Sequence, residues 1–88
     1  MLTVYSKTVC PYCTQAKNLL KLKNIDFTEV NIEHDTDARN KMVTMGLRTV
    51  PQIFKGDELF VEGGFQGLSN LSDEELDLRL GRTNLGTL

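Results

Sequence analysis

The 88-residue chain is poor in several residue types, and each shortage narrows its function. It has no tryptophan, and its only histidine and cysteines are His34, Cys10 and Cys13. A tetrahedral structural zinc site needs four ligands, which these three side chains do not supply. No apolar run approaches the roughly 18 residues of a membrane-spanning helix, and the first residues do not have the pattern of a signal peptide. We therefore expect no metal site, and neither a membrane nor a nucleic acid among the partners.

Length and composition are those of one small globular domain. Hydrophobic residues make up 40% of the chain and charged residues 25%, with a net charge of -2, which is ordinary for a globular protein. Two cysteines two residues apart are more often catalytic than structural in a reducing compartment, so we expect a cytoplasmic protein. We expect a monomer with one domain over residues 1–81 and a loose tail over residues 82–88.

Alternation and helical spacing predict the order of the elements. Alternating segments predict strands at residues 2–5, 27–32, 52–55 and 58–61. Helical spacing predicts helices at residues 11–24 and 36–45 and from about residue 66, the last one divided near Asn70 because Ser72 and Glu75 form a capping box. Strands joined by a helix should be parallel, and the hairpin at Gly56-Asp57 antiparallel. The prediction is an α/β fold of order βαβαββα, a four-stranded mixed sheet with helices on both faces.

The two cysteines form the motif Cys10-Pro11-Tyr12-Cys13 at the start of the first predicted helix. Free N–H groups and the positive end of the helix dipole favour a thiolate there, and the thiolate is the nucleophile. Such a pair beside a strand-helix-strand pattern predicts a thioredoxin-like redox site. Cys10 precedes the helix and should be exposed and attack disulfides. Cys13 lies on the inward stripe and should be the buried resolving thiol.

Two other interpretations of the cysteines, and one of the surrounding charge, remain open. A structural disulfide that closes about four residues would stabilise the fold by only about 2 kcal/mol, through its restriction of the unfolded chain. Half a zinc site would need further ligands, which the chain lacks.

Residues 1–25 contain four lysines and no acid, which would favour a thiolate and an anionic thiol substrate. These lysines could equally be solvated, with Lys7 the best candidate for a role because it lies three residues before Cys10.

Two further segments could line a site. If the Val50–Pro51 bond is cis, the backbone of Val50 is exposed beside the cysteines and could pair with a substrate peptide. The residue pattern alone favours a trans Val50–Pro51 bond, because few X–Pro bonds in folded proteins are cis. Gly63-Gly64-Phe65-Gln66 opens a helix whose free N–H groups could bind a carboxylate, although a plain turn would look the same.

Together these residues resemble the glutaredoxin family. Lys7 with Cys10-Pro11-Tyr12-Cys13, then Thr49-Val50-Pro51, then Gly63-Gly64 occur in the family's order and spacing, over about residues 1–80. The resemblance implies a thioredoxin-like fold, a glutaredoxin-like domain over residues 1–81 and a cis Pro51. It also implies a glutathione-dependent thiol-disulfide oxidoreductase that reduces protein disulfides and glutathione mixed disulfides, with no tightly bound cofactor. A ribonucleotide reductase would be one client.

The same resemblance implies a glutathione site. Lys7 and Gln52 would meet the glycine carboxylate, Val50 would pair with the cysteinyl backbone, and Phe65-Gln66 would hold the γ-glutamyl end. Many members carry an Asp or Ser with a further acid after the glycine pair, whereas this chain has Phe65-Gln66-Gly67, which leaves Gln66 as a neutral acceptor. Arg48 would either add to the carboxylate clamp or bond solvent. The full expected set is Lys7, Tyr12, Arg48, Thr49, Val50, Pro51, Gln52, Gly64, Phe65 and Gln66.

The sequence is also compatible with two alternative functions. One is an iron–sulfur carrier in which Cys10 and glutathione hold a [2Fe–2S] cluster between two subunits. Such carriers mostly have a single active-site cysteine, so Cys13 and the Pro-Tyr pair argue against it. The other is a disulfide reductant fed by thioredoxin reductase, which only a reductase assay distinguishes from a glutathione-dependent enzyme.

Overall fold

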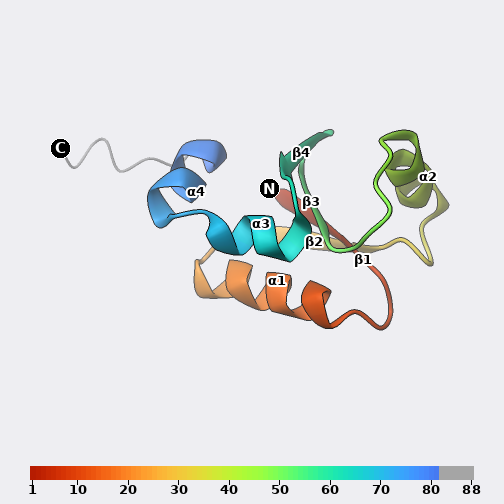
Figure 1. The fold of residues 1–88 in the computed structure, drawn as a ribbon, viewed down its shortest axis with the longest axis horizontal. Helices are drawn as coiled ribbons and strands as arrows, with labels where there is room; N and C mark the ends of the chain where they lie inside the picture. The colour runs from red at the N-terminus through yellow and green to blue at the C-terminus, as the bar shows by residue number, and fades with distance from the viewer. Residues whose placement is uncertain (82–88) are drawn as a thin grey trace.

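The computed structural model describes residues 1–81, in which helices cover both faces of a four-stranded sheet (Figure 1). The sheet has the strand order β2-β1-β3-β4, with β1 parallel to β2, and β3 antiparallel to both β1 and β4. This confirms the predicted mixed sheet. The predicted tail at 82–88 lies outside the described residues. The elements are β1 (Leu2–Ser6), α1 (Pro11–Leu22), β2 (Phe27–Asn31), α2 (Thr36–Thr44), β3 (Gln52–Lys55), β4 (Glu58–Val61), α3 (Gly64–Asn70) and α4 (Asp73–Leu80).

The final helical region is two helices, as the capping box indicates. The hydroxyl of Ser72 accepts a hydrogen bond from the backbone N–H of Glu75 at 3.1 Å and so starts α4, because such a bond satisfies one of the free donors of a new helix. The helix α3 begins at Gly64, two residues earlier than predicted. The glycine pair is therefore part of the helix start and not only of the turn before it.

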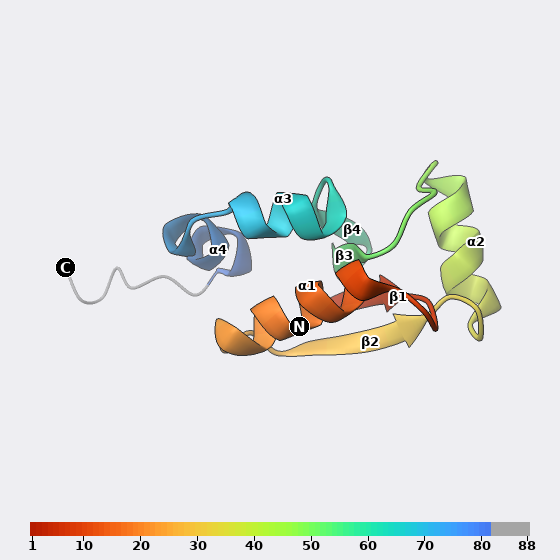
Figure 2. The same cartoon turned by 60° about the horizontal axis from the view of Figure 1, so that its bottom comes forward.

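The core lies on both faces of the sheet. Tyr5 and Phe54 project from the sheet toward Ala38 and Met42 of α2, and the two aromatic rings stack with centroids 4.8 Å apart. Figure 2 shows α1 and α3 running side by side, with α2 apart from them. The larger cluster packs β1, β3 and β4 against α1, α3 and α4, and consists of Leu2, Val4, Ala16, Leu20, Ile25, Ile53, Phe60, Val61, Leu68 and Leu76.

This arrangement brings three helix and loop segments to one end of the sheet. The chain leaves β1 at Ser6, passes through Cys10 and enters α1, while the segment before β3 and the start of α3 approach from the other side. None of the helices in residues 1–81 is both long and apolar enough to cross a membrane. The candidate site lies at the end of the sheet where these segments meet.

Candidate active site

The two cysteines differ in exposure and are joined by a disulfide. Cys10 is the N-cap of α1 and is partly exposed, whereas the side chain of Cys13 is 2% exposed and faces the core with Ala16 and Leu20. The backbone N–H of Cys13 donates to Sγ of Cys10 at 3.1 Å. A donor in this position favours a thiolate on Cys10 after reduction. The exposures agree with those expected for an attacking Cys10 and a resolving Cys13.

The segment before β3 carries a cis peptide bond beside the disulfide. The bond between Val50 and Pro51 is cis, so the trans bond favoured by spacing alone was wrong and the bond implied by the resemblance is confirmed. The carbonyl oxygen of Val50 lies 3.8 Å from Sγ of Cys10. A substrate backbone that pairs with Val50 would therefore have its own sulfur close to Cys10.

The start of α3 is pressed against this cis segment at Gly64. Gly64 has a φ of +57°, and a Cβ built on it would lie 2.6 Å from the carbonyl oxygen of Pro51. Only glycine has both the positive φ and the missing side chain that this approach needs. The sequence reveals the glycine pair but not its neighbour, because Pro51 and Gly64 are brought together only by the tertiary fold.

A groove of about 330 Å³ lies between α1, the cis segment and α3. On its wall the rings of Tyr12 and Phe65 stack with their centroids 6.1 Å apart and an interplanar angle of 27°. None of the side chains that line it is charged. The lining residues are Tyr12, Thr49, Val50, Pro51, Gly63, Gly64, Phe65 and Gln66. The groove thus brings together seven of the ten residues predicted to bind glutathione, and adds Gly63.

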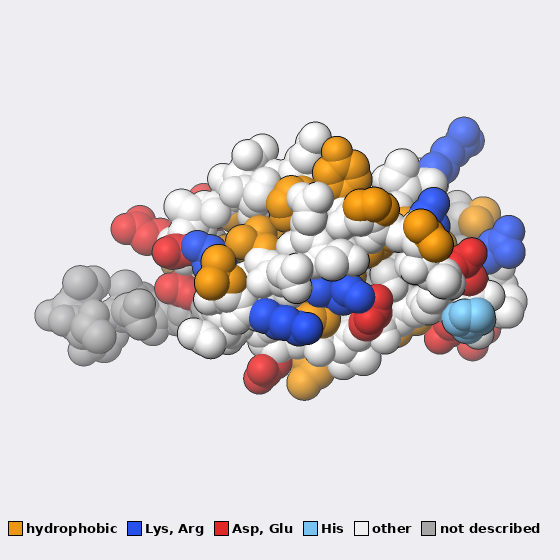
Figure 3. Space-filling view, turned by 90° about the horizontal axis from the view of Figure 1, so that it is seen from below, with side chains coloured by type: hydrophobic (Ala, Val, Ile, Leu, Met, Phe, Trp, Pro, Cys, Tyr) orange, Lys and Arg blue, Asp and Glu red, His pale blue; other side chains and the backbone are white. Residues whose placement is uncertain are grey.

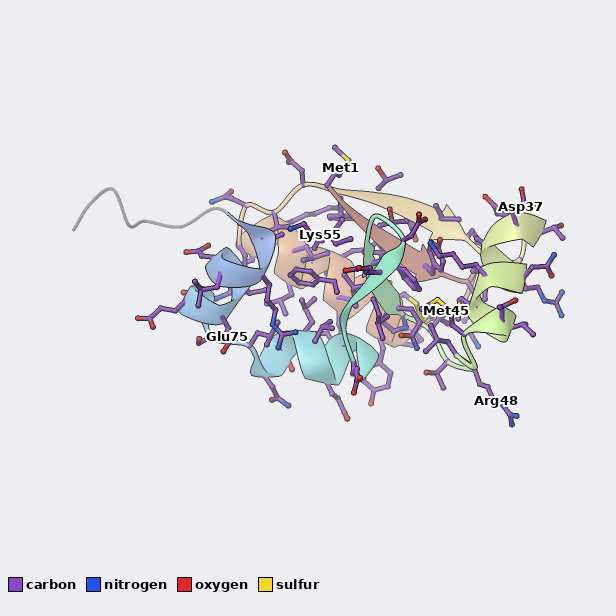
Figure 4. All side chains as sticks on the ribbon, turned by 90° about the horizontal axis from the view of Figure 1, so that it is seen from above. Met1, Asp37, Met45, Arg48, Lys55 and Glu75 are labelled. Carbon is purple, nitrogen blue, oxygen red and sulfur yellow. A yellow bond between two sulfur atoms is a disulfide. The ribbon has the colours of Figure 1, made fainter. Side chains whose placement is uncertain are left out.

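The other three predicted residues do not line this groove. Gln52 is only 5% exposed, and its side-chain Nε2 donates to the backbone oxygen of Thr49 at 2.9 Å and to the Thr49 hydroxyl at 3.3 Å. Arg48 is exposed and its side chain points away from the disulfide (Figure 4). Lys7 is exposed on the segment before Cys10. Their contact with glutathione remains a prediction.

Polar side chains that sequence reasoning missed hold the segment before Cys10. The backbone N–H of Thr8 donates to the Glu33 carboxylate at 2.6 Å, the Thr8 hydroxyl accepts from the Asn31 amide at 3.3 Å, and Asn31 in turn accepts from the backbone N–H of Glu33 at 2.9 Å. Hydrogen bonds from the Thr8 hydroxyl and then from its backbone N–H lower the pKa of Glu33. The sequence held a signal for this cluster. Because β1 and β2 are parallel, their carboxyl ends meet at one edge of the sheet, and the polar residues that follow both strands come together there.

The lysines of the first 25 residues are not all free to act on the site. Lys17 donates to the carboxylate of Glu29 at 2.8 Å, and Lys23 pairs with Asp73. The buried hydroxyl of Ser6 donates to the same Glu29 oxygen at 2.7 Å. Two of the four lysines are therefore partly neutralised by acids from β2 and α4, which argues against a role for these two at the cysteines. In residues 1–81 no group of three or more metal-ligating side chains comes together.

Comparison with known proteins places this site in a family. The glutaredoxin family model matches residues 2–60. The glutaredoxin-like protein NrdH of Lactococcus lactis subsp. cremoris is 39% identical over 66 residues, which are 75% of this chain and 89% of that protein. Glutaredoxin 3 of Escherichia coli (strain K12) is 44% identical over 52 residues, or 58% of this chain. That match spans 63% of glutaredoxin 3, less than two thirds of its length.

Solved structures show the same fold, which is that of thioredoxin-like glutaredoxins, as the resemblance implies. A buckwheat glutaredoxin in complex with glutathione superimposes with a TM-score of 0.60 at 26% identity, covering 92% of this chain and 70% of that one. The NrdH-redoxin from Escherichia coli, a glutaredoxin-like protein described as having a thioredoxin-like activity profile, also gives a TM-score of 0.60, at 25% identity over 64% of this chain and 74% of its own. With the family model matching well over half of the sequence, the chain belongs to the glutaredoxin family.

Proposed function

We propose that this protein is a glutathione-dependent thiol-disulfide oxidoreductase that reduces protein disulfides and glutathione mixed disulfides. The observation that carries the proposal is the pairing of a partly exposed Cys10 with a buried Cys13, next to an open groove of about 330 Å³. A volume of that size falls at the lower end of small-ligand sites. It would hold a short peptide segment and not a large cofactor.

The reaction begins with reduced cysteines. The thiolate of Cys10 attacks one sulfur of the substrate disulfide, forms a mixed disulfide and releases the other sulfur as a thiolate that takes up a proton. Cys13 then loses its proton and attacks Sγ of Cys10, which releases the second substrate sulfur and leaves the Cys10–Cys13 disulfide. Two electrons pass from the protein to the substrate. Two glutathione molecules return them and leave as glutathione disulfide.

Neighbouring groups assist each step in a defined way. The backbone N–H of Cys13, 3.1 Å from Sγ of Cys10, stabilises the thiolate that attacks and that leaves. The exposed backbone of Val50 would pair with the substrate and hold its sulfur in line with Cys10. Because Cys13 is buried, an outside disulfide meets Cys10 first. The division of labour between the thiols therefore follows from access.

A second reductant has a specific observation in its favour. The groove has no charged lining side chain, whereas glutathione carries an ammonium and two carboxylates. The similar NrdH-redoxin is described as having a thioredoxin-like activity profile. A supply of electrons from a flavoprotein thioredoxin reductase is therefore the alternative to glutathione. Either system suits a monomer in a reducing cytoplasm, with a ribonucleotide reductase as one client.

A coupled assay tests the proposal. Oxidation of NADPH is followed with the protein, a disulfide substrate and either glutathione with glutathione reductase or thioredoxin reductase alone. We expect turnover with glutathione, abolished by Cys10→Ser and not by Leu78→Ala, a change at an exposed residue of α4. Turnover with thioredoxin reductase alone would instead select the second reductant.

A further inference from the structure

The aromatic pair on the groove wall is accessible to a bound substrate. Tyr12 is 56% exposed and Phe65 is partly exposed, and the two rings stack across the gap between α1 and α3. Hydrophobic side chains gather on the surface where these helices adjoin (Figure 3). Contact between exposed aromatic faces of this kind and another large apolar or aromatic group lowers the free energy of binding.

The chemistry of the groove favours an uncharged occupant beside this pair. Thr49 and Gln66 supply neutral polar groups, and no lysine, arginine, aspartate or glutamate lines the groove. A charged substrate group placed there would lose water without gaining an ion pair, which costs free energy. An apolar side chain has no charge to desolvate and would bury apolar surface on both partners.

The residue before Phe65 brings it next to the cis segment. A Cβ built on Gly64 would lie 2.6 Å from the carbonyl oxygen of Pro51, so the start of α3 packs closely on that segment. Phe65 follows directly and lines the same groove as Val50, whose carbonyl oxygen is 3.8 Å from Sγ of Cys10. A substrate backbone lying along Val50 therefore carries its cysteine to Cys10 and a neighbouring side chain toward the aromatic pair.

We propose that Phe65, stacked on Tyr12, is a specificity-determining residue that selects disulfides whose cysteine stands next to an aromatic or large aliphatic residue. The substrate class is a peptide or protein cystine with an apolar neighbour. Glutathione disulfide and cystines beside acidic residues react more slowly because the charged group meets the same uncharged wall. The inference rests on the proposed thiol-disulfide reaction, but not on which reductant regenerates the protein.

A single-turnover experiment isolates this preference. The protein is reduced, freed of reductant and mixed with disulfide-linked homodimers of acetyl-Ser-X-Cys-Gly-amide, where X is Phe, Leu, Gly or Glu. A second series places X after the cysteine, and glutathione disulfide is the last substrate. Free peptide thiol is measured after acid quenching. We expect the Phe and Leu peptides of one series to react roughly tenfold faster than the Glu peptide, the discrimination typical of an apolar contact.

Variants locate the effect. Phe65→Ala and Tyr12→Ala should slow the Phe peptide severalfold more than they slow the Glu peptide, whereas Phe65→Tyr should retain the preference. Leu78→Ala removes an exposed apolar side chain from α4, away from the groove, and should change no rate. Because Phe65 also packs against the core, thermal unfolding of each variant is measured, and Tyr12→Ala serves if Phe65→Ala does not fold.

The outcomes separate the two proposals. Equal rates for all peptides in both series, or equal slowing of the Phe and Glu peptides by Tyr12→Ala, would overturn the role of the aromatic pair while leaving the thiol-disulfide function in place. If the reduced protein releases no thiol from any disulfide, the proposed function itself fails. A preference for the apolar peptides that Tyr12→Ala or Phe65→Ala abolishes supports the inference under either reductant.

Discussion

The asymmetry between Cys10 and Cys13 is set by one turn of helix. Cys10 is the N-cap and meets solvent, while Cys13 lies three residues on, on the same face as Ala16 and Leu20, and is 2% exposed. Residues spaced three or four apart share a helix face, so the inward stripe of α1 carries the second sulfur into the core. The first sulfur stays at the helix start, where the N–H of Cys13 reaches it.

Removal of the second thiol should separate two activities. In Cys13→Ser, Cys10 can still take glutathione from a mixed disulfide and be freed by a second glutathione, but cannot be released intramolecularly from a protein mixed disulfide. We expect the variant to keep a measurable part of its activity on a glutathionylated peptide and to lose more than about tenfold on a protein disulfide such as insulin. Equal loss on both substrates, measured in the same coupled assay, would contradict the division of roles.

A charge reversal at Lys7 tests what the exposed ammonium does. Lys7 is exposed, three residues before Cys10, and is outside the groove lining. If it holds a substrate carboxylate, Lys7→Glu should raise the KM for glutathione severalfold with little change in the pH at which Cys10 becomes reactive to iodoacetamide. If it stabilises the thiolate, that pH should rise instead.

Lys21→Glu is the matched control for this substitution, because it makes the same charge change at an exposed position of α1 away from the motif. A Lys7→Glu protein with an unaltered KM and an unaltered pH profile would assign Lys7 to the solvated surface. A shift of equal size in both variants would show that only the overall charge matters.

At the scale of elements, the close approach of α3 to the cis segment positions the site. The start of α3 at Gly64 and the backbone of Pro51 are in contact, and Phe65 and Val50 lie on either side of that contact in the same groove. The groove therefore depends on the missing side chain at Gly64. A substitution there should be felt both in stability and in substrate binding.

Gly64→Ala should be more destabilising than alanine at another glycine of positive φ. Gly46 has a φ of +73° and nothing within 4 Å of a built Cβ, whereas Gly64 has a φ of +57° and the Pro51 oxygen at 2.6 Å. Both variants have the left-handed strain of about 1–2 kcal/mol. Only Gly64→Ala adds an overpacking cost of about 1–3 kcal/mol. Urea unfolding of the two variants measures the difference, and equal free energies of unfolding would show that the contact gives way freely.

Local signals in the sequence predicted most elements. The alternation around Gly56-Asp57 gave the hairpin with strands at Gln52–Lys55 and Glu58–Val61, and Pro11 placed the first residue of α1. Both depend on residues adjacent in sequence, where propensity and turn chemistry act. The start of α3 was predicted two residues too late because local signals alone assign a glycine pair to a turn. The contact of Gly64 with Pro51, which places it in the helix start, depends on the tertiary fold.

The contacts that shape the site were beyond sequence reasoning. The resemblance implies that Gln52 meets the glycine carboxylate of glutathione, but the fold buries its side chain against Thr49. The stacking of Tyr12 on Phe65 joins residues 53 positions apart, and the Thr8–Glu33 hydrogen bond joins the segments that follow β1 and β2, which α1 separates in the sequence. Such pairs depend on the tertiary arrangement and not on local spacing. The sequence therefore identifies the reactive thiols better than it identifies the walls around them.

At the scale of the whole molecule, one polar network ties three elements together beside the reactive end. The carboxylate of Glu29 on β2 accepts from Lys17 of α1 at 2.8 Å and from the buried hydroxyl of Ser6, at the end of β1, at 2.7 Å. Ser6 leads directly into the segment that carries Cys10. The network thus couples the ionisation of one carboxylate to the anchoring of α1 on the sheet.

The stability of the fold should depend on pH through Glu29. The hydrogen bond from Lys17, and after it that from Ser6, lowers the pKa of Glu29 below its usual 4.5. A lowered folded-state pKa stabilises the protein above the unfolded-state value, and this contribution is lost as the pH falls through the folded-state value. Because the pair is partly exposed, Glu29→Gln should lower the free energy of urea unfolding at pH 7 by only about 0.2–1 kcal/mol.

The difference between the wild type and Glu29→Gln should stay constant from pH 8 to pH 6 and shrink as the pH falls below about 4.5, where the unfolded carboxyl becomes protonated. Glu74→Gln makes the same charge change at an exposed residue of α4, outside the network. Ser6→Ala removes one donor without changing the charge, so it should weaken the acid dependence without abolishing it. A free-energy difference for Glu29→Gln that is the same at pH 3 as at pH 7 would mean that the network does not stabilise the folded carboxylate.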